Sequence, residues 1–108
     1  MTALISRDEL REAIAAGTVT VVDALAGDYW AKQHLPTAIP LAEAHVAALA
    51  PRLLPDKSAA IVTYCSNVLC ANSQQVANRL NALGYTNVRK YHEGIQDWVE
   101  AGLPVETA

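Results

Sequence analysis

At residues 61–73 the chain reads Ile61-Val62-Thr63-Tyr64-Cys65-Ser66-Asn67-Val68-Leu69-Cys70-Ala71-Asn72-Ser73. The first four residues are rich in β-branched side chains, which is typical of a buried strand. Small and polar residues follow the first cysteine. Residues 74–83 then have the apolar spacing of an amphipathic helix, and Gly84 marks its end. The pattern predicts a strand, a loop that opens at Cys65, and a helix.

Cys65 is therefore expected to lie beside the N-terminus of a helix. Unpaired backbone N–H groups converge at such an end, and the helix dipole favours negative charge there. A thiol in this position is expected to have a lowered pKa and to attract anions. The residue pattern predicts a nucleophilic cysteine. An inert buried thiol is the open alternative, because free cysteine is among the most buried residue types.

The rest of the chain alternates between strand and helix patterns. Alternating strands and helices predict an α/β fold, in which a parallel sheet carries helices on both faces. The carboxyl ends of the strands, with Asp23 and Cys65, are expected to share one edge of this sheet. The expected strands are 4–5, 19–23, 61–64 and 87–91, with a short edge strand within 34–40, and the expected helices are 7–16, 28–32, 41–49, 74–83 and 95–101.

Several local expectations accompany these elements. Ser6 and Glu9 fit a capping box at the start of the first helix, and Gly17 is expected to end it. Pro51 is expected to limit the alanine-rich helix that starts at Leu41. Two further expectations concern the last elements of the chain: one of Arg89 and Lys90 should face solvent, and the inner face of the final helix should consist of Ile95, Trp98 and Val99.

Length and composition predict one domain over residues 1–108, with 52% hydrophobic residues available to fill one core. The net charge of −3 gives no basic surface for nucleic acid. No apolar run approaches the roughly 18 residues that span a membrane, and no signal peptide pattern opens the chain. We therefore expect a cytoplasmic protein with reduced thiols and with neither nucleic acid nor membrane as partner.

A structural metal site is not expected. Such a site takes four ligands, whereas the chain has two cysteines, and its histidines, His34, His45 and His92, are scattered along the sequence.

Taken together, these landmarks resemble the rhodanese-like (sulfurtransferase) family over nearly the whole chain. That family has a five-stranded, mostly parallel sheet flanked by helices on both faces. The segments that carry the resemblance follow one another in the family's order: Val21-Val22-Asp23, residues 34–40, the loop after Tyr64-Cys65, Leu83-Gly84-Tyr85, residues 93–98 and residues 101–105.

The resemblance implies a sulfurtransferase in which Cys65 is the catalytic residue. Its thiolate would take a sulfane sulfur from thiosulfate or from a thiol or protein persulfide, become a persulfide, and pass the sulfur to a nucleophilic acceptor, with a protein as one candidate acceptor. Neither a metal nor an organic cofactor takes part. The substrate-binding loop would be Ser66, Asn67, Val68, Leu69, Cys70, Ala71 and Asn72, whose main-chain N–H groups stabilise anions.

The chain departs from the family pattern at this loop. It lacks the Arg and the Gly that many thiosulfate-using relatives carry, it is about two residues longer, and it contains Cys70. The usual Asp-x-Arg after the second strand is Asp23-Ala24-Leu25 here. The loss of two fixed cations is expected to weaken the binding of a doubly charged donor, because each charge-assisted contact contributes roughly 1.5–3 kcal/mol.

Several roles stay open from the sequence. The domain is either a transferase or a non-catalytic rhodanese-fold module for binding or thiol sensing. Cys70 either packs in the loop or forms a disulfide with Cys65. The side chains of Ser66, Asn67 and Asn72 are expected to satisfy loop backbone groups and to cap the helix. Structural roles are expected for the remaining conspicuous residues, which are Asp23, Trp30, His34 and Trp98.

Overall fold

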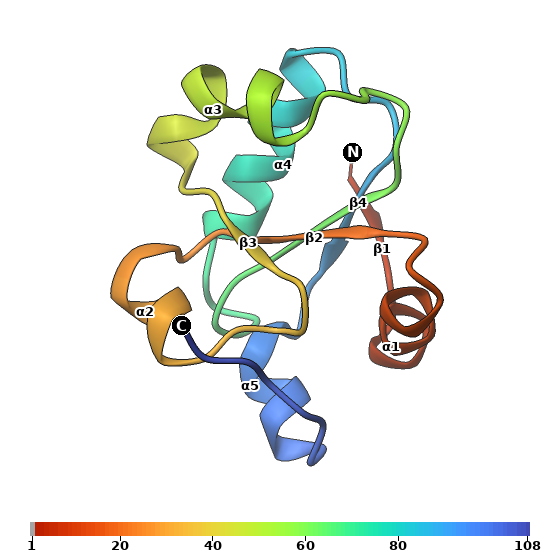
Figure 1. Ribbon diagram of the computed structural model, residues 1–108, viewed down its shortest axis with the longest axis vertical. Helices are drawn as coiled ribbons and strands as arrows, with labels where there is room; N and C mark the ends of the chain where they lie inside the picture. The colour runs from red at the N-terminus through yellow and green to blue at the C-terminus, as the bar shows by residue number, and fades with distance from the viewer. Residues whose placement is uncertain (1) are drawn as a thin grey trace.

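A five-stranded sheet organises the chain in the computed structural model, which describes residues 2–108 (Figure 1). The strand order is β1-β5-β4-β2-β3, and each neighbouring pair runs parallel. The predicted parallel α/β sheet is thereby confirmed. The strands are β1 (Ala3–Leu4), β2 (Thr20–Asp23), β3 (Ile39–Pro40), β4 (Ile61–Tyr64) and β5 (Val88–Tyr91).

Helices cover both faces of the sheet (Figure 1). On one face α3 and α4 pack against β2 and β4, and on the other face α1 and α5 do so. The connections are α1 (Arg7–Ala16), α2 (Gly27–Lys32), a 3₁₀ turn at Glu43–His45, α3 (Val46–Leu53), α4 (Asn72–Ala82) and α5 (Gly94–Glu100). Across residues 2–108, none of these helices combines the length and the apolar character that crossing a bilayer requires.

The strands β2 and β4 are almost fully buried because both of their faces are covered. In β2, Val22 belongs to the core under α3 and α4, whereas Val21 belongs to the core under α1 and α5. Ile61 and Val62 divide in the same way in β4. Alternation of side chains across a strand sends successive residues to opposite faces, so a continuous apolar run serves two cores.

The first helix forms as the sequence predicts. The backbone N–H of Glu9 donates to Ser6 Oγ at 3.2 Å, and the backbone N–H of Ser6 donates to Glu9 Oε1 at 3.3 Å. These two bonds complete the capping box. Gly17 ends the helix with φ at +69°, a left-handed conformation that suits glycine.

The prediction that Pro51 limits the third helix is wrong, because Pro51 lies inside α3. Tertiary contacts hold the chain helical beyond it. The Tyr85 hydroxyl donates to the carbonyls of Ala50 and Leu54, at 3.1 and 2.5 Å, and the Leu54 side chain is buried. These contacts offset the hydrogen bond that a proline removes from a helix.

Two predictions about exposure near the C-terminus are also wrong. Val99 is 42% exposed rather than on the inner face of α5, since the packing of Ile95 and Trp98 turns Val99 toward the side of the helix. Arg89 and Lys90 are both half-buried. Their strand, β5, lies between β1 and β4, and the Lys90 ammonium donates to Gln74 Oε1 at 3.1 Å instead of pointing freely into solvent.

Candidate functional site

The loop that follows β4 leaves the carboxyl edge of the sheet. Asp23 at the end of β2 lies in register with Tyr64 at the end of β4, and Cys65 is the next residue. The expectation that Asp23 and Cys65 share one sheet edge is therefore confirmed. Helix α4 begins at Asn72, so residues 65–71 form the loop between strand and helix.

Cys65 is a buried thiol, with 2% of its surface exposed. Its Sγ donates to the carbonyl oxygen of Cys70 at 3.4 Å, and the Ser73 hydroxyl oxygen lies 3.5 Å from the same sulfur. Burial raises the pKa of the Cys65 thiol, and its contact with Cys70 adds to this effect. The hydroxyl and the amide of Ser73 act in the opposite direction and are outweighed. The expected lowering of the Cys65 pKa is therefore wrong, because desolvation exceeds the influence of the helix N-terminus.

Cys70 has the opposite character. Burial by itself would raise the pKa of Cys70, but four interactions together lower it: the Cys65 thiol, the backbone amides of Asn72 and Ser66, and the Ser66 hydroxyl. Both cysteines are free thiols, and Cys70 is the less buried of the two. The loop therefore favours the thiolate form at Cys70 more than at Cys65.

A tight turn folds Cys70 back toward Cys65. The backbone N–H of Cys70 donates to the carbonyl of Asn67 at 3.1 Å, and the N–H of Leu69 donates to Asn67 Oδ1 at 2.9 Å. Asn67 thus satisfies loop backbone groups, as predicted. The apolar tip of the turn points outward, and Leu69 is 90% exposed.

The predicted cap at Asn72 is not formed. Asn72 is already the first residue of α4, the preceding Ala71 provides the cap position, and no side chain caps this end. The free N–H groups of Asn72 and Ser73 face the two sulfur atoms instead. The N–H groups that a capping side chain would otherwise occupy are therefore available to the two thiols, which explains why a capping side chain is absent.

Helix α5 fixes the beginning of the loop. The backbone N–H of Ile95 donates to the Cys65 carbonyl at 2.9 Å, and that of Gln96 donates to the Ser66 carbonyl at 3.0 Å. Gly94 has φ at +74°, and a Cβ on it would come within 2.6 Å of the Cys65 carbonyl oxygen. The close approach therefore requires glycine at position 94.

Sequence reasoning did not assign Ser73, Gly94 or Gln96 to the site. Gln96 makes a second contact with the loop, because its Oε1 accepts a hydrogen bond from Asn67 Nδ2 at 3.1 Å. Ser73 is adjacent to the predicted loop, so its position was a usable signal. Gly94 and Gln96 come from a distant element, and the chain offers no local pattern that links them to Cys65.

A cavity of about 590 Å³ opens beside the loop between α2 and α5. Its walls are largely apolar, and Lys32 and Glu100 bring one charge of each sign. Ser66 connects it to the cysteine loop. A small molecule held there would lie next to the loop that carries both thiols. The lining residues are Leu25, Tyr29, Lys32, Gln33, Ser66, Ile95, Gln96, Val99 and Glu100.

Asp23 makes contacts that agree with a structural role. Its Oδ1 accepts the N–H groups of Leu25 and Ala26 at 2.7 and 3.0 Å, and its Oδ2 accepts the Tyr64 hydroxyl at 2.7 Å. The carboxylate therefore holds the loop after β2 and ties it to the end of β4.

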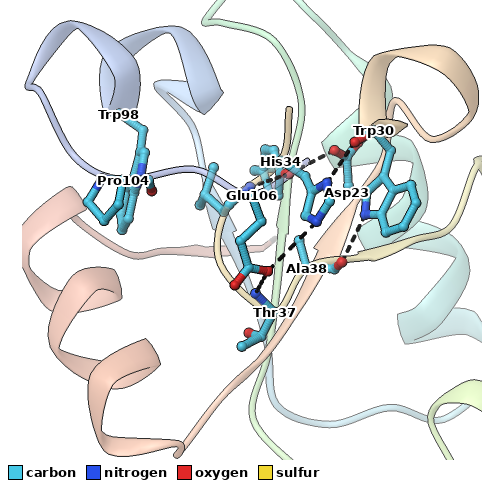
Figure 2. A network of polar contacts seen from close by, with 10 residues as sticks. Asp23, Trp30, His34, Thr37, Ala38, Trp98, Pro104 and Glu106 are labelled. Atoms are coloured by element: carbon cyan, nitrogen blue, oxygen red, sulfur yellow. Dashed lines mark hydrogen bonds and ion pairs between the residues drawn. The ribbon is translucent and has the colours of Figure 1, made fainter. Parts of the chain in front are cut away.

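His34 and the two tryptophans also make structural contacts (Figure 2). The buried His34 ring stacks on Trp30 with a centroid distance of 4.3 Å, and its Nδ1 donates to the Trp30 carbonyl at 2.6 Å. Trp98 is buried and donates from Nε1 to the Pro104 carbonyl at 2.8 Å. The three rings thus fasten connecting segments to the neighbouring helices α2 and α5. Within residues 2–108, no group of three His, Cys, Asp or Glu side chains is placed to hold a metal ion.

Comparisons with solved structures show the same fold elsewhere. The BH2092 protein from Bacillus halodurans superposes with a TM-score of 0.82 at 25% identity, over 98% of this chain and 77% of that one. A thiosulfate sulfurtransferase from Pseudomonas aeruginosa gives 0.86 at 23% identity, over 97% of this chain and 20% of that one. At this identity the second likeness shows the fold alone.

The sequence of the chain also matches one known protein and one protein-family model. The chain is 31% identical over 102 residues to the HTH-type transcriptional regulator Rv0324 of Mycobacterium tuberculosis. The match covers 94% of this chain but 44% of that protein, so the chain spans less than half of its relative's length. The model of the Rhodanese-like domain matches residues 6–101, which include both cysteines and every helix. The chain therefore belongs to the rhodanese-like domain family.

Proposed function

We propose that the protein is a sulfurtransferase that carries a sulfane sulfur on Cys65. One observation supports this above the others: Cys65 directly follows β4 of a rhodanese-like domain, and its sulfur lies 3.5 Å from the Ser73 hydroxyl in the first turn of α4 and 3.4 Å from the carbonyl of a second cysteine, Cys70. The proposed site consists of Cys65 and the loop Ser66, Asn67, Val68, Leu69, Cys70, Ala71 and Asn72.

In the first step Cys65 must lose its proton. We propose Cys70 as the base, because the two side chains interact and the pKa of Cys70 is the lower one; Cys70 then passes the proton to solvent. The Cys65 thiolate then attacks the outer sulfur of the donor. A new S–S bond forms as the donor's S–S bond breaks, and the rest of the donor leaves as sulfite or as a thiolate.

In the second step a nucleophilic acceptor attacks the outer sulfur of the Cys65 persulfide and restores the Cys65 thiolate. Residues 66–72 contain no basic side chain, so only uncharged hydrogen-bond donors, the backbone N–H groups and the Ser and Asn side chains, would bind the sulfur donor within the loop. This favours a thiol or protein persulfide over thiosulfate, whose two charges are better held by fixed cations.

The test is an intact-mass measurement of the reduced protein after incubation with thiosulfate and, separately, with glutathione persulfide. We expect the gain of one sulfur atom, which a reducing thiol removes and which the Cys65→Ser variant does not show. Reversal by thiol distinguishes persulfide from sulfinic acid, which is nearly equal in mass and is not thiol-reversible. A reversible sulfur gained by Cys65→Ser would instead place the chemistry at Cys70 and contradict the proposal.

We propose a non-catalytic, thiol-sensing module as the second candidate. Two observations favour it: Cys65 is almost fully buried, and the relative that shares 31% identity is a transcriptional regulator with further chain outside this match. A sensor would take up sulfur and hold it, whereas a transferase would release it to cyanide or a thiol. Release of sulfur to such acceptors, followed by reloading of the same protein, separates the two functions.

A further inference from the structure

We infer that Cys70 resolves the Cys65 persulfide from within the loop, releasing the outer sulfur as hydrosulfide and leaving a Cys65–Cys70 disulfide. The inference rests on the proposed function, because its starting species is the persulfide on Cys65. It assigns a chemical role to the second thiol and makes hydrosulfide a product of the protein itself.

The shape of the loop is the first observation that supports this role of Cys70. The turn over residues 67–70 is closed by two hydrogen bonds to Asn67, and it returns Cys70 to Cys65. As a result the Cys65 sulfur donates to the Cys70 carbonyl at 3.4 Å, and the two side chains also interact.

The inner and outer sulfur atoms of a Cys65 persulfide differ in their accessibility, which also supports this role of Cys70. Cys65 is 2% exposed, so a bulky external acceptor reaches the outer sulfur of a persulfide more easily than the inner sulfur. Cys70 lies inside the loop, with its carbonyl oxygen 3.4 Å from Cys65 Sγ, the atom that would become the inner sulfur. The two possible attacks thus have different products. An external nucleophile takes the outer sulfur and leaves the Cys65 thiolate, whereas Cys70 attacks the inner sulfur, forms a disulfide with Cys65 and releases the outer sulfur.

The lowered pKa of Cys70 is the third observation that supports its role. Against the effect of burial, the Cys65 thiol, the amides of Asn72 and Ser66 and the Ser66 hydroxyl lower the pKa of Cys70. The two amides and the hydroxyl remain when Cys65 carries a persulfide. The thiolate is the form that attacks a disulfide-type sulfur, so these groups favour the reactive form of Cys70.

The proposed step is balanced without an outside oxidant. The Cys70 thiolate attacks the inner sulfur of the persulfide, a Cys65–Cys70 S–S bond forms, and the bond between the inner and outer sulfur breaks. The outer sulfur leaves with the electron pair of that bond as HS⁻. The sulfane sulfur is reduced to sulfide, and the two cysteine sulfurs are oxidised to the disulfide.

The experiment follows one turnover under argon without added thiol. The reduced protein is loaded with glutathione persulfide and desalted, sulfide is trapped with monobromobimane, and the protein mass and free thiols are recorded over time. Cys70→Ser and Cys70→Ala are treated in parallel, so that the serine hydroxyl is itself controlled. Protein without donor is the control for adventitious oxidation, and circular dichroism checks that the variants are folded.

We expect the wild-type protein to release one sulfide per chain, to lose both thiols and to yield a Cys65–Cys70 linked peptide. The rate should be independent of protein concentration, as for an intramolecular reaction. Both Cys70 variants should hold the added sulfur at least about tenfold longer, because they lack the adjacent attacking thiolate.

Two other results separate the inference from the function on which it rests. Equal lifetimes of the persulfide in the wild-type protein and both Cys70 variants would overturn the resolving role of Cys70 and leave the transferase intact. If neither the wild-type protein nor the Cys70 variants gain sulfur from glutathione persulfide or from thiosulfate, and the wild-type protein releases no sulfide and keeps both thiols, both the inference and the proposed function are overturned.

Discussion

Two cysteines five residues apart have opposite acid–base behaviour in this loop. Burial raises the pKa of Cys65, whereas Cys70 is half-buried and receives hydrogen bonds that lower its pKa. The position of Cys65 after a strand was readable from the sequence. The sequence did not show which of the two sulfurs has the lower pKa. This difference depends on the turn at residues 67–70, which decides which backbone amides of the folded loop lie beside each sulfur.

This difference predicts an order of alkylation. Thiolate increases as pH rises through a pKa, so Cys70 should react with iodoacetamide below the ordinary thiol pKa of about 8.5, and Cys65 only above it. Peptide mass spectrometry over a pH series measures both cysteines in one sample. In Cys70→Ser the reaction of Cys65 should move to lower pH, because the contacts with Cys70 that raise its pKa are gone. Identical pH profiles for the two cysteines would contradict the assignment.

At the scale of elements, the site is a junction between the loop after β4 and the start of α5. Two backbone hydrogen bonds join them, from Ile95 and Gln96 to the carbonyls of Cys65 and Ser66. They orient the first two residues of the loop without any side chain. The N-terminus of α5 therefore positions Cys65 although it contributes no reactive group.

Gly94→Ala tests this junction, and Gly102→Ala is its matched control. Both glycines have positive φ, +74° and +77°, so both variants bear the backbone strain of roughly 1–2 kcal/mol. At Gly102 the new methyl group meets nothing within 4 Å, whereas at Gly94 it would lie 2.6 Å from the Cys65 carbonyl oxygen. We expect greater loss of stability in urea, and greater loss of sulfur loading, for Gly94→Ala. Equal effects of the two variants would show that the contact with the loop is unimportant.

The sequence predicted the elements better than their exposure. β-branched runs, the capping box at Ser6 and the glycine at position 17 are local signals, and each element they predict is present. The predicted helix end at Pro51 and the predicted burial of Val99 were wrong because the surroundings of both residues come from distant parts of the chain. The Tyr85 hydroxyl holds the carbonyls on either side of Pro51, and the cavity next to α2 leaves Val99 uncovered.

Across the whole molecule, the C-terminal segment closes over the turn that precedes β3 (Figure 2). The backbone N–H of Glu106 donates to the His34 carbonyl at 2.8 Å, and the Glu106 carbonyl accepts the His34 N–H at 2.9 Å. The Glu106 carboxylate also accepts the N–H of Thr37, a residue whose φ is +67°. Positive φ is unfavourable for a β-branched residue, so this bond stabilises a strained turn.

A pair of substitutions at position 106 separates the two kinds of contact. Glu106→Ala removes the carboxylate alone and should lower the free energy of unfolding by about 1 kcal/mol. Glu106→Pro also removes the N–H that pairs with the buried His34 carbonyl, which should cost a further 1–3 kcal/mol or so. Urea denaturation measures both, and sulfur loading at Cys65 should be unchanged. Equal stability of the two variants would mean that the backbone pair contributes little.

The sheet ends on both sides in very short strands. β1 and β3 have two residues each, and β3 finishes at Pro40, which has no N–H to offer. A second chain that approached either side would find few free backbone groups to pair with, and long uncovered edges are what drive sheets to add strands from their neighbours. The short edge strands therefore protect the fold against edge-to-edge aggregation and keep the longer central strands β2, β4 and β5 away from neighbouring chains.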